Sequence, residues 1–296
     1  MVSAVAIRRI DGAPGEVYYP LSTISLPEPT PKANEVVVRI SAAALNHRDL
    51  FIRQHLYPKI GFNIPLLADG CGIVISTGSS SKAQRLLQER VILVPGVGWD
   101  ESPYGPEDID KYLIRGGTRS GPTGTLSEMV CVDADEVVLA PKHLSDEEAA
   151  ALPLAGLTAW RAVYVKALDV VRPGNNILVT GIGGGVALMV LMLAQASGAN
   201  VYVTSGKEEK LQRAEQLGAS GGVNYRDALW DAKLLKMLPA ERKWMDAVID
   251  GAGGNLGEKA VNILRVGALA ADSPRALCQI DQCHFSCNKY TYLLTW

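Results

Sequence analysis

A glycine-rich turn between a β-branched segment and an apolar segment gives the strongest indication of the fold. The turn reads Gly181-Ile182-Gly183-Gly184-Gly185-Val186 and directly follows Ile177-Leu178-Val179-Thr180, which has the residue types of a buried strand. Glycines at these positions allow a tight turn and a close backbone approach to a pyrophosphate, and the helix that follows would offer free N–H groups to it. The sequence therefore predicts a dinucleotide-binding unit, in which Val186 replaces the usual third glycine. The alternative is a tight strand-to-helix turn that binds nothing.

The segments after this turn continue in the order strand, helix, strand, helix. Strands are expected at 200–204 and 246–250, and helices at 181–197, 207–217 and about 255–264. Such a succession is typical of a parallel sheet covered by helices. We therefore predict an α/β protein with a Rossmann domain, a doubly wound parallel sheet, over residues 146–270. This domain would begin with a helix capped by Ser145 and Glu148.

The preceding part of the chain has the pattern of a mainly β domain. Short β-branched runs at 36–40, 72–75, 90–94 and 129–132 are separated by Gly, Pro, Ser and Asp. A Gly- and Pro-rich stretch between residues 95 and 124 has no periodicity, so we expect a long loop there. These features predict a first domain over residues 1–145.

Charge and hydropathy argue against nucleic acid and membrane partners. The 29 basic and 31 acidic residues are spread along the chain, and the net charge is −2. The longest apolar run, Val186–Ala194, is far shorter than the roughly 20 residues that span a bilayer. The N-terminus lacks the order of a secretory signal, and five cysteines do not predict a disulfide framework. We expect a cytoplasmic protein that binds a small molecule.

The residues about 20 positions after the glycine turn indicate which dinucleotide is bound. An NAD-specific site places Asp or Glu there, whereas this chain has Thr204-Ser205-Gly206-Lys207. No carboxylate would repel a 2′-phosphate at this position, and Ser205, Lys207 and Lys210 could donate hydrogen bonds to it. NADP(H) is therefore the predicted cofactor. The alternative for the lysines is a solvated helix face.

Five further motifs occur together between Leu26 and Gly267: Ala44-Leu45-Asn46-His47-Arg48-Asp49, Leu56-Tyr57-Pro58, Gly124-Thr125-Leu126-Ser127-Glu128, residues 152–162, and Lys210 with Leu217-Gly218-Ala219 and Asn224-Tyr225. Jointly they resemble the medium-chain dehydrogenase/reductase family. The resemblance is greatest to its zinc-free, quinone oxidoreductase-like and zinc-type alcohol dehydrogenase-like members. It implies a GroES-like catalytic domain, a Rossmann domain, a cofactor in the cleft between them and, typically, a homodimer.

The resemblance also bears on zinc. In zinc-dependent relatives a cysteine stands at the position of Asn46, and a His-Glu pair at that of Ala68-Asp69. A catalytic zinc needs three Cys, His or acidic ligands, so two of these positions are unsuitable. Residues 99–117 contain no cysteine, so the structural zinc lobe is also missing, and no metal is predicted. The run Cys278, Cys283, His284 and Cys287 has metal-binding residue types, with accidental clustering as the alternative.

A site without zinc is suited to passing hydride from NADPH to an enone, a quinone or another activated carbonyl or alkene. By the resemblance, Tyr57 would donate a proton, Asn46 would hold the acceptor carbonyl or the ribose, and Thr158 would contact the nicotinamide or its phosphate. Tyr225 looks like the adenosine-side tyrosine of NADPH-binding members. Alternatively, Tyr57 is only a wall residue, Asn46 a turn residue and Thr158 a hydroxyl at the amino end of a helix. His47 is either a surface histidine or a proton donor.

After Gly267 the sequence departs from the family's pattern. The family continues into further strands and a helix, whereas residues 271–296 form a Cys-, Asn- and Tyr-rich tail without strand–helix rhythm. Missing C-terminal strands would expose a sheet edge and argue against the usual dimer. Two hypotheses follow: an active NADPH-dependent reductase, or a truncated, catalytically poor relative that only binds NADPH or a partner.

Overall fold

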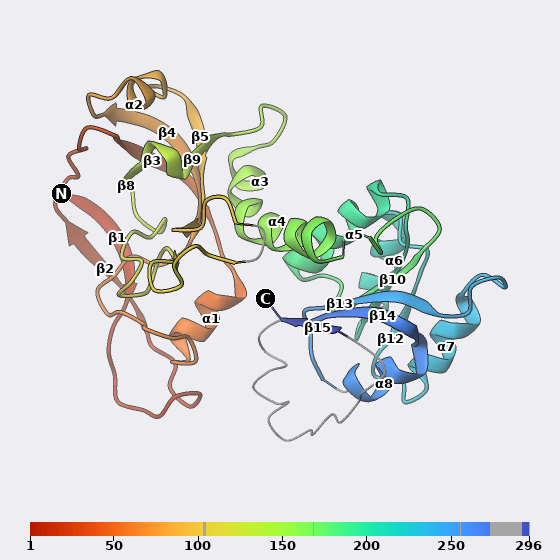
Figure 1. The fold of residues 1–296 in the computed structure, drawn as a ribbon. Coiled ribbons are helices and arrows are strands. Elements are labelled where there is room, and N and C mark those ends of the chain that lie inside the picture. The colour runs from red at the N-terminus through yellow and green to blue at the C-terminus, as the bar shows by residue number, and fades with distance from the viewer. Residues whose placement is uncertain (103–104, 168, 255, 273–291, 296) are drawn as a thin grey trace. The chain divides into compact units, whose positions relative to one another are not determined.

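The chain forms two compact units in a computed structural model, Met1–Ala155 and Gly156–Trp296. The structure describes residues 1–102, 105–167, 169–254, 256–272 and 292–295 (Figure 1). Each unit has buried apolar clusters of its own. The domain ranges expected from the sequence, 1–145, 146–270 and 271–296, stay predictions.

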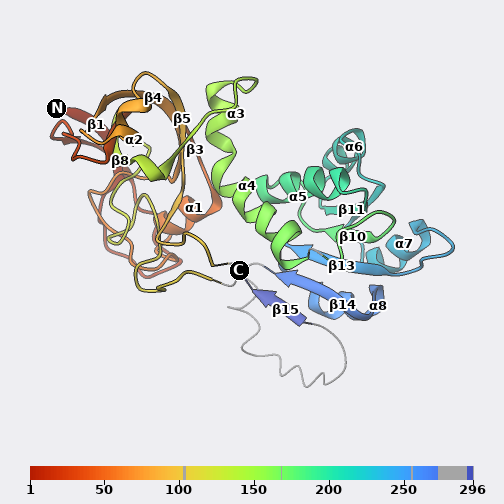
Figure 2. The ribbon, with the colours of Figure 1, turned by 45° about the horizontal axis from the view of Figure 1, so that its top comes forward.

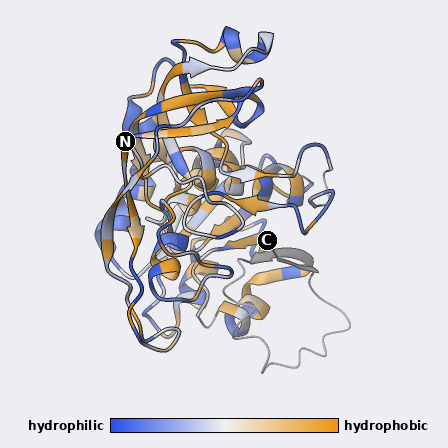
Figure 3. Cartoon of the chain, turned by 90° about the vertical axis from the view of Figure 1, so that its left-hand side faces the viewer, coloured by the Kyte–Doolittle hydropathy of each residue, from blue (hydrophilic) through white to orange (hydrophobic). Residues whose placement is uncertain are grey.

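An antiparallel sheet of five strands lies at the centre of the first unit. The four predicted β-branched runs correspond to four of its strands, so this part of the prediction is confirmed. Their valines, among them Val36, Val74 and Val91, pack in one cluster, and Figure 3 shows apolar residues concentrated in the strands. In sheet order the strands are β8 (Met129–Asp133), β3 (Glu35–Ala44), β4 (Asp69–Thr77), β5 (Arg90–Leu93) and β9 (Val137–Leu139).

Shorter elements complete the first unit. The segment 95–124, expected to be a loop throughout, contains a pair of two-residue strands, so the expectation is wrong at those residues. Strands this short carry no periodicity that a sequence pattern could reveal. These elements are β1 (Val2–Ile7) paired with β2 (Leu21–Leu26), β6 (Gly96–Val97) paired with β7 (Leu113–Ile114), the helices α1 (His47–Arg53), α2 (Ser81–Arg85) and α3 (Asp146–Ala151), and the 3₁₀ helix η1 (Ala134–Glu136).

The capping box at the start of α3 is confirmed. The Ser145 hydroxyl accepts a hydrogen bond from the Glu148 backbone N–H at 3.2 Å, and the Glu148 carboxylate accepts one from the Ser145 N–H at 2.9 Å. These bonds satisfy N–H groups that the helix itself leaves unpaired. The helix α4 (Pro153–Trp160) and the π-helix η2 (Arg161–Lys166) follow.

The second unit contains a parallel sheet of six strands. The predicted strands and helices of the βαβα succession are confirmed, whereas β12, α7 and β14 were not predicted. In sheet order the strands are β12 (Gly221–Asn224), β11 (Asn200–Ser205), β10 (Asn176–Val179), β13 (Met245–Asp250), β14 (Leu264–Asp272) and β15 (Tyr292–Thr295). The helices are α5 (Gly185–Ala196), α6 (Glu208–Gln216), α7 (Trp230–Met237) and α8 (Leu256–Ile263).

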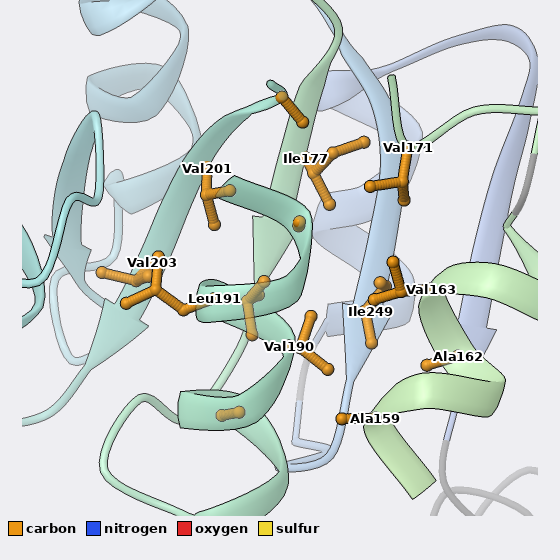
Figure 4. Close-up of a cluster of buried hydrophobic side chains, with 14 of the residues drawn as sticks. Ala159, Ala162, Val163, Val171, Ile177, Val190, Leu191, Val201, Val203 and Ile249 are labelled. Atoms are coloured by element: carbon orange, nitrogen blue, oxygen red, sulfur yellow. The ribbon is translucent and has the colours of Figure 1, made fainter. Parts of the chain in front are cut away.

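Helices cover both faces of this sheet (Figure 2). On one face, Ile177 and Val203 pack with side chains of η2, α5 and α6 (Figure 4). On the other, Leu178 packs with Trp230 of α7 and Ile263 of α8. Successive residues of a strand point to opposite faces, so a strand buried on both sides reads as a continuous apolar run.

The C-terminal end of the sheet differs from the prediction. The tail was expected to contain no strand, yet β15 pairs in parallel with β14. Residues 273–291 lie outside the described residues, and with them the predicted metal-like run from Cys278 to Cys287. Within the described part of the chain, no helix is both long and apolar enough to cross a membrane.

Candidate functional site

The glycine turn lies at the end of β10, where the sheet changes its direction of growth. The chain runs from β10 outward to β11 and β12, and then returns to the other side of β10 as β13. In open parallel sheets, ligands bind beyond the carboxyl ends of the strands at such a reversal. The glycine-rich turn thus lies at the position in the topology where ligands of such sheets bind.

Two glycines of this turn have a backbone conformation that other residues rarely adopt. The φ angles are +64° at Gly181 and +108° at Gly183, and Gly183, Gly184 and Gly185 are exposed. A Cβ atom on Gly181 would lie 2.9 Å from the Cβ of Ala252, so a side chain there would clash with the next loop. The turn therefore keeps its backbone accessible, as a pyrophosphate site requires.

Positive charge gathers at this turn from two sources. The helix α5 begins at Gly185, and no side chain in the described part of the chain caps its amino end, where the helix dipole is positive. The Lys210 side chain reaches over the turn, because a Cβ atom on Gly183 would lie 2.8 Å from its Nζ. Both features favour an anion at this place.

A second group of polar side chains surrounds the end of β11. Ser205 is buried, and its hydroxyl accepts a hydrogen bond from the Lys207 N–H at 3.2 Å. A Cβ atom on Gly206 would lie 2.7 Å from the Tyr225 hydroxyl oxygen and 3.0 Å from Arg226 Nε. The side chains of Tyr225 and Arg226 thus converge over Gly206 and provide hydrogen-bond donors of the kind that bind phosphate.

Arg226 was missed by the sequence analysis. Its only signal in the sequence is its place directly after Tyr225. Lys210, a candidate donor to the 2′-phosphate, lies against the glycine turn near Gly183, and its role stays a prediction.

In the first unit, a buried carboxyl group joins two of the segments that carry family motifs. The Nδ2 of Asn46, the residue that precedes α1, donates to Asp69 Oδ2 at 2.8 Å, and the Leu154 N–H donates to Asp69 Oδ1 at 3.0 Å. The pKa of Asp69 is raised to about 6, chiefly by burial and to a smaller extent by the nearby Asp49, while the two hydrogen bonds oppose the rise. Asn46 is therefore held by its amide at the first turn of α1.

Tyr57 packs against a buried arginine of α1. The Arg48 guanidinium carbon lies 4.7 Å from the centre of the Tyr57 ring, and the guanidinium also donates to the carbonyls of Arg115 and Gly116 at 3.0 and 2.9 Å. A cation above an aromatic face fixes the orientation of the ring. Tyr57 is half-buried, and the neighbouring Leu56 is exposed.

The structure groups the predicted residues by unit. Asn46 and Tyr57 lie in the first unit, on either side of α1, while His47 is exposed as its first residue. Thr158 lies half-buried on α4, in the second unit, as do all the predicted cofactor residues.

The residues present do not fit a catalytic zinc ion. Among the described residues, no three His, Cys, Asp or Glu side chains gather closely enough to hold a metal. Asn46 carries an amide, and its amide nitrogen is already bonded to Asp69.

Comparisons with known proteins agree with this two-part organisation. A family model described as "Alcohol dehydrogenase GroES-like domain" matches residues 32–142, and one described as "Zinc-binding dehydrogenase" matches residues 185–271. Together with the parallel sheet, these matches confirm the predicted fold class, a GroES-like domain followed by a Rossmann domain.

Individual relatives extend the match. The zinc-type alcohol dehydrogenase-like protein YogA of Leptosphaeria maculans is 48% identical over 260 residues, which are 86% of this chain and 72% of that protein. The 2-methylene-furan-3-one reductase of Solanum lycopersicum is 31% identical over 242 residues, 81% of this chain and 54% of the reductase. A crystal structure of an NAD-dependent alcohol dehydrogenase superimposes with a TM-score of 0.76 and 30% identity, and covers 99% of this chain and 84% of its own.

Proposed function

Because the chain belongs to the medium-chain dehydrogenase/reductase family of oxidoreductases, we propose that it reduces an enone, a quinone or another activated carbonyl or alkene with NADPH and without zinc. The observation that carries this proposal is the glycine turn at the reversal of the sheet, with Lys210 over it and Tyr225 and Arg226 over Gly206. These groups offer separate positions for a pyrophosphate and for a 2′-phosphate.

The choice of NADPH over NADH rests on the end of β11. Ser205 stands where an NAD-specific site places a carboxylate, and the Arg226 guanidinium lies beside it over Gly206. A guanidinium matches the geometry of a phosphate and carries a fixed positive charge. A 2′-phosphate would therefore find donors here and no like charge at position 205.

The choice of acceptor rests on the missing Lewis acid. With no set of zinc ligands among the described residues, nothing there could polarise an unactivated alcohol or carbonyl through a metal. An acceptor that is already electrophilic does not need this help. The similarity to 2-methylene-furan-3-one reductase, whose printed name describes an activated alkene, supports this choice.

In the proposed mechanism, NADPH supplies the hydride when bound. The turn at Gly181–Gly185 and Lys210 would hold its pyrophosphate, and Thr158 would contact the nicotinamide or its phosphate. Asn46, held in place by Asp69, orients the acceptor carbonyl or the ribose. Tyr57, held by Arg48, provides the proton that completes the reduction.

The test is to titrate the full chain with NADPH and with NADH, followed by fluorescence, and then to measure NADPH oxidation with a small quinone and with an enone. We expect tighter binding of NADPH and turnover with at least one acceptor. Ser205→Asp should reverse the cofactor preference, whereas Ser220→Asp, outside this group, should not. Binding without turnover would support the alternative of a relative that only binds NADPH, and absence of binding would overturn the proposal.

A further inference from the structure

A second glycine-rich loop follows β13, at the carboxyl ends of the strands, where the glycine turn also lies. It reads Gly251-Ala252-Gly253-Gly254. Gly253 and Gly254 have φ angles of +70° and +83°, which explains glycine at these two positions. Gly251 has no such angle, and a Cβ atom there would meet no atom of the described residues within 4 Å. Neither the conformation nor the packing of the described residues therefore requires glycine at 251.

A buried pair of side chains ties this loop to the glycine turn. Asp250 and Thr180 are both buried, and the Thr180 hydroxyl donates to Asp250 Oδ1. The Asp250 carboxylate also accepts from the N–H groups of Ala252 at 3.1 Å and Gly253 at 3.0 Å. The Thr180 oxygen in turn accepts from the Gly251 N–H at 3.3 Å. The pair therefore fixes the loop to the residue that directly precedes the turn.

The strand order indicates which part of a bound dinucleotide would contact this loop. A dinucleotide lies across the reversal of the sheet with its pyrophosphate at the glycine turn. The groups suited to the adenosine phosphate, around Gly206, lie at β11 and β12, on one side of β10. The loop 251–254 follows β13, on the other side, so the nicotinamide half would extend over it.

We propose that Thr180 and Asp250 are positioning residues that hold the loop 251–254 as the wall for the nicotinamide half of the cofactor. This inference rests on the proposed NADPH site and deepens it. Gly251 is then glycine because the ligand, rather than the protein, occupies the space that its side chain would fill.

The first test compares Gly251→Ala with Gly174→Ala. At both positions an added Cβ would meet no described atom within 4 Å. Gly174 precedes β10, at the amino ends of the strands and thus opposite to the glycine turn. Its φ angle of +78° makes its substitution by alanine the more strained of the two. Dissociation constants are measured for NADPH by fluorescence and for adenosine 2′,5′-bisphosphate by calorimetry. The bisphosphate lacks the nicotinamide half and serves as the internal reference.

We expect Gly251→Ala to weaken NADPH binding about tenfold and to leave bisphosphate binding within about twofold of the wild-type value. Gly174→Ala should change neither constant. Unchanged NADPH binding by Gly251→Ala, or an equal loss for both ligands, would overturn the proposed wall.

The second test removes the hydroxyl that links the two loops. Thr180→Val keeps the side-chain volume, and we expect it to weaken NADPH about tenfold without weakening the bisphosphate, while Thr180→Ser restores binding. An equal loss for both ligands in Thr180→Val would mean general loosening and would overturn the positioning role. If the wild-type chain bound neither ligand, the proposed cofactor site would fail with it, which the wild-type titration alone reveals.

Discussion

At the scale of single residues, burial makes Asp69 hold its proton more tightly than an ordinary aspartate. Its exposed fraction is 0%, and burial raises its pKa from 3.8 to about 6 against the opposing hydrogen bonds of Asn46 and Leu154. Between these two pKa values the folded state binds more protons than the unfolded state. The stability contributed by this group is therefore full below the unfolded pKa of 3.8 and is lost as the pH rises through about 6.

Replacing Asp69 with Asn should remove this pH dependence. The free energy of unfolding of Asp69→Asn relative to wild type should rise by on the order of 3 kcal/mol between about pH 4 and pH 8, because the variant no longer buries a charge. Urea unfolding of both proteins across this range measures the difference. Asp11→Asn, at an exposed position, is the control, and its curve should parallel that of the wild type. A parallel curve for Asp69→Asn would contradict the prediction.

If the proposed NADPH site is correct, the charge of Arg226 should distinguish NADPH from NADH. Its guanidinium lies over Gly206 beside Tyr225. Arg226→Ala should raise the KM for NADPH about tenfold, because a charge-assisted hydrogen bond to the 2′-phosphate is lost, and should leave the KM for NADH unchanged. Arg213→Ala is the matched control, since Arg213 bonds Gln216 on the exposed side of α6. Equal changes for both cofactors would remove Arg226 from the specificity site.

The residues of the site could be predicted only where a motif marks them. Ser205 and Lys210 follow the glycine turn at a spacing that the dinucleotide fold dictates, so the sequence identified them as candidates. The bond from Asn46 to Asp69 joins residues 23 apart in different elements, and the contact of Arg226 with Gly206 depends on how β11 and β12 pair. Such contacts arise from tertiary packing, which no local pattern records.

At the scale of elements, the start of α3 depends on one serine. The helix has six residues and buries Ala149 and Ala150 against Cys71. A helix this short is not stable alone, so its cap and its packing decide whether it forms. Ser145→Ala should lower the free energy of unfolding by about 1 kcal/mol, because the Glu148 N–H loses its partner. Ser145→Thr keeps the hydroxyl and should lose much less in the same urea titration; equal losses would contradict a capping role.

Elements were predicted where their residue pattern has one interpretation. The buried strands β10, β11 and β13 read as apolar, β-branched runs, the glycine turn marks α5 after β10, and the capping box marks α3 in the first unit. The strand β2 was missed because its side chains alternate only between exposed and half-buried positions. The strand β15 was missed because its pairing with β14 is set by the sheet and not by its own four residues.

At the scale of the whole molecule, the fold class could be predicted from the β-branched runs, the glycine turn and the alternation of strands and helices. The β-branched runs of the first half predicted a mainly β domain, and the glycine turn within alternating strands and helices predicted the parallel sheet. A family description that mentions zinc does not by itself bring zinc ligands to this chain. The amide of Asn46 and the lack of a cluster of acidic, Cys or His side chains among the described residues are the observations behind the zinc-free proposal, which stays a prediction.

The whole chain should therefore be stabilised by the dinucleotide and not by a metal. At about 100 times its dissociation constant, NADPH should raise the free energy of unfolding by about 2.7 kcal/mol, because it binds only the folded state, and NADH at the same concentration should raise it less. Treatment with a chelator should change neither the unfolding midpoint nor the turnover with a quinone. A loss of either on chelation, restored by added zinc, would overturn the zinc-free proposal while leaving the NADPH site intact. If the glycine turn binds NADPH together with Lys210 and with the Tyr225–Arg226 pair, both the stabilisation by NADPH and the turnover should persist after chelation.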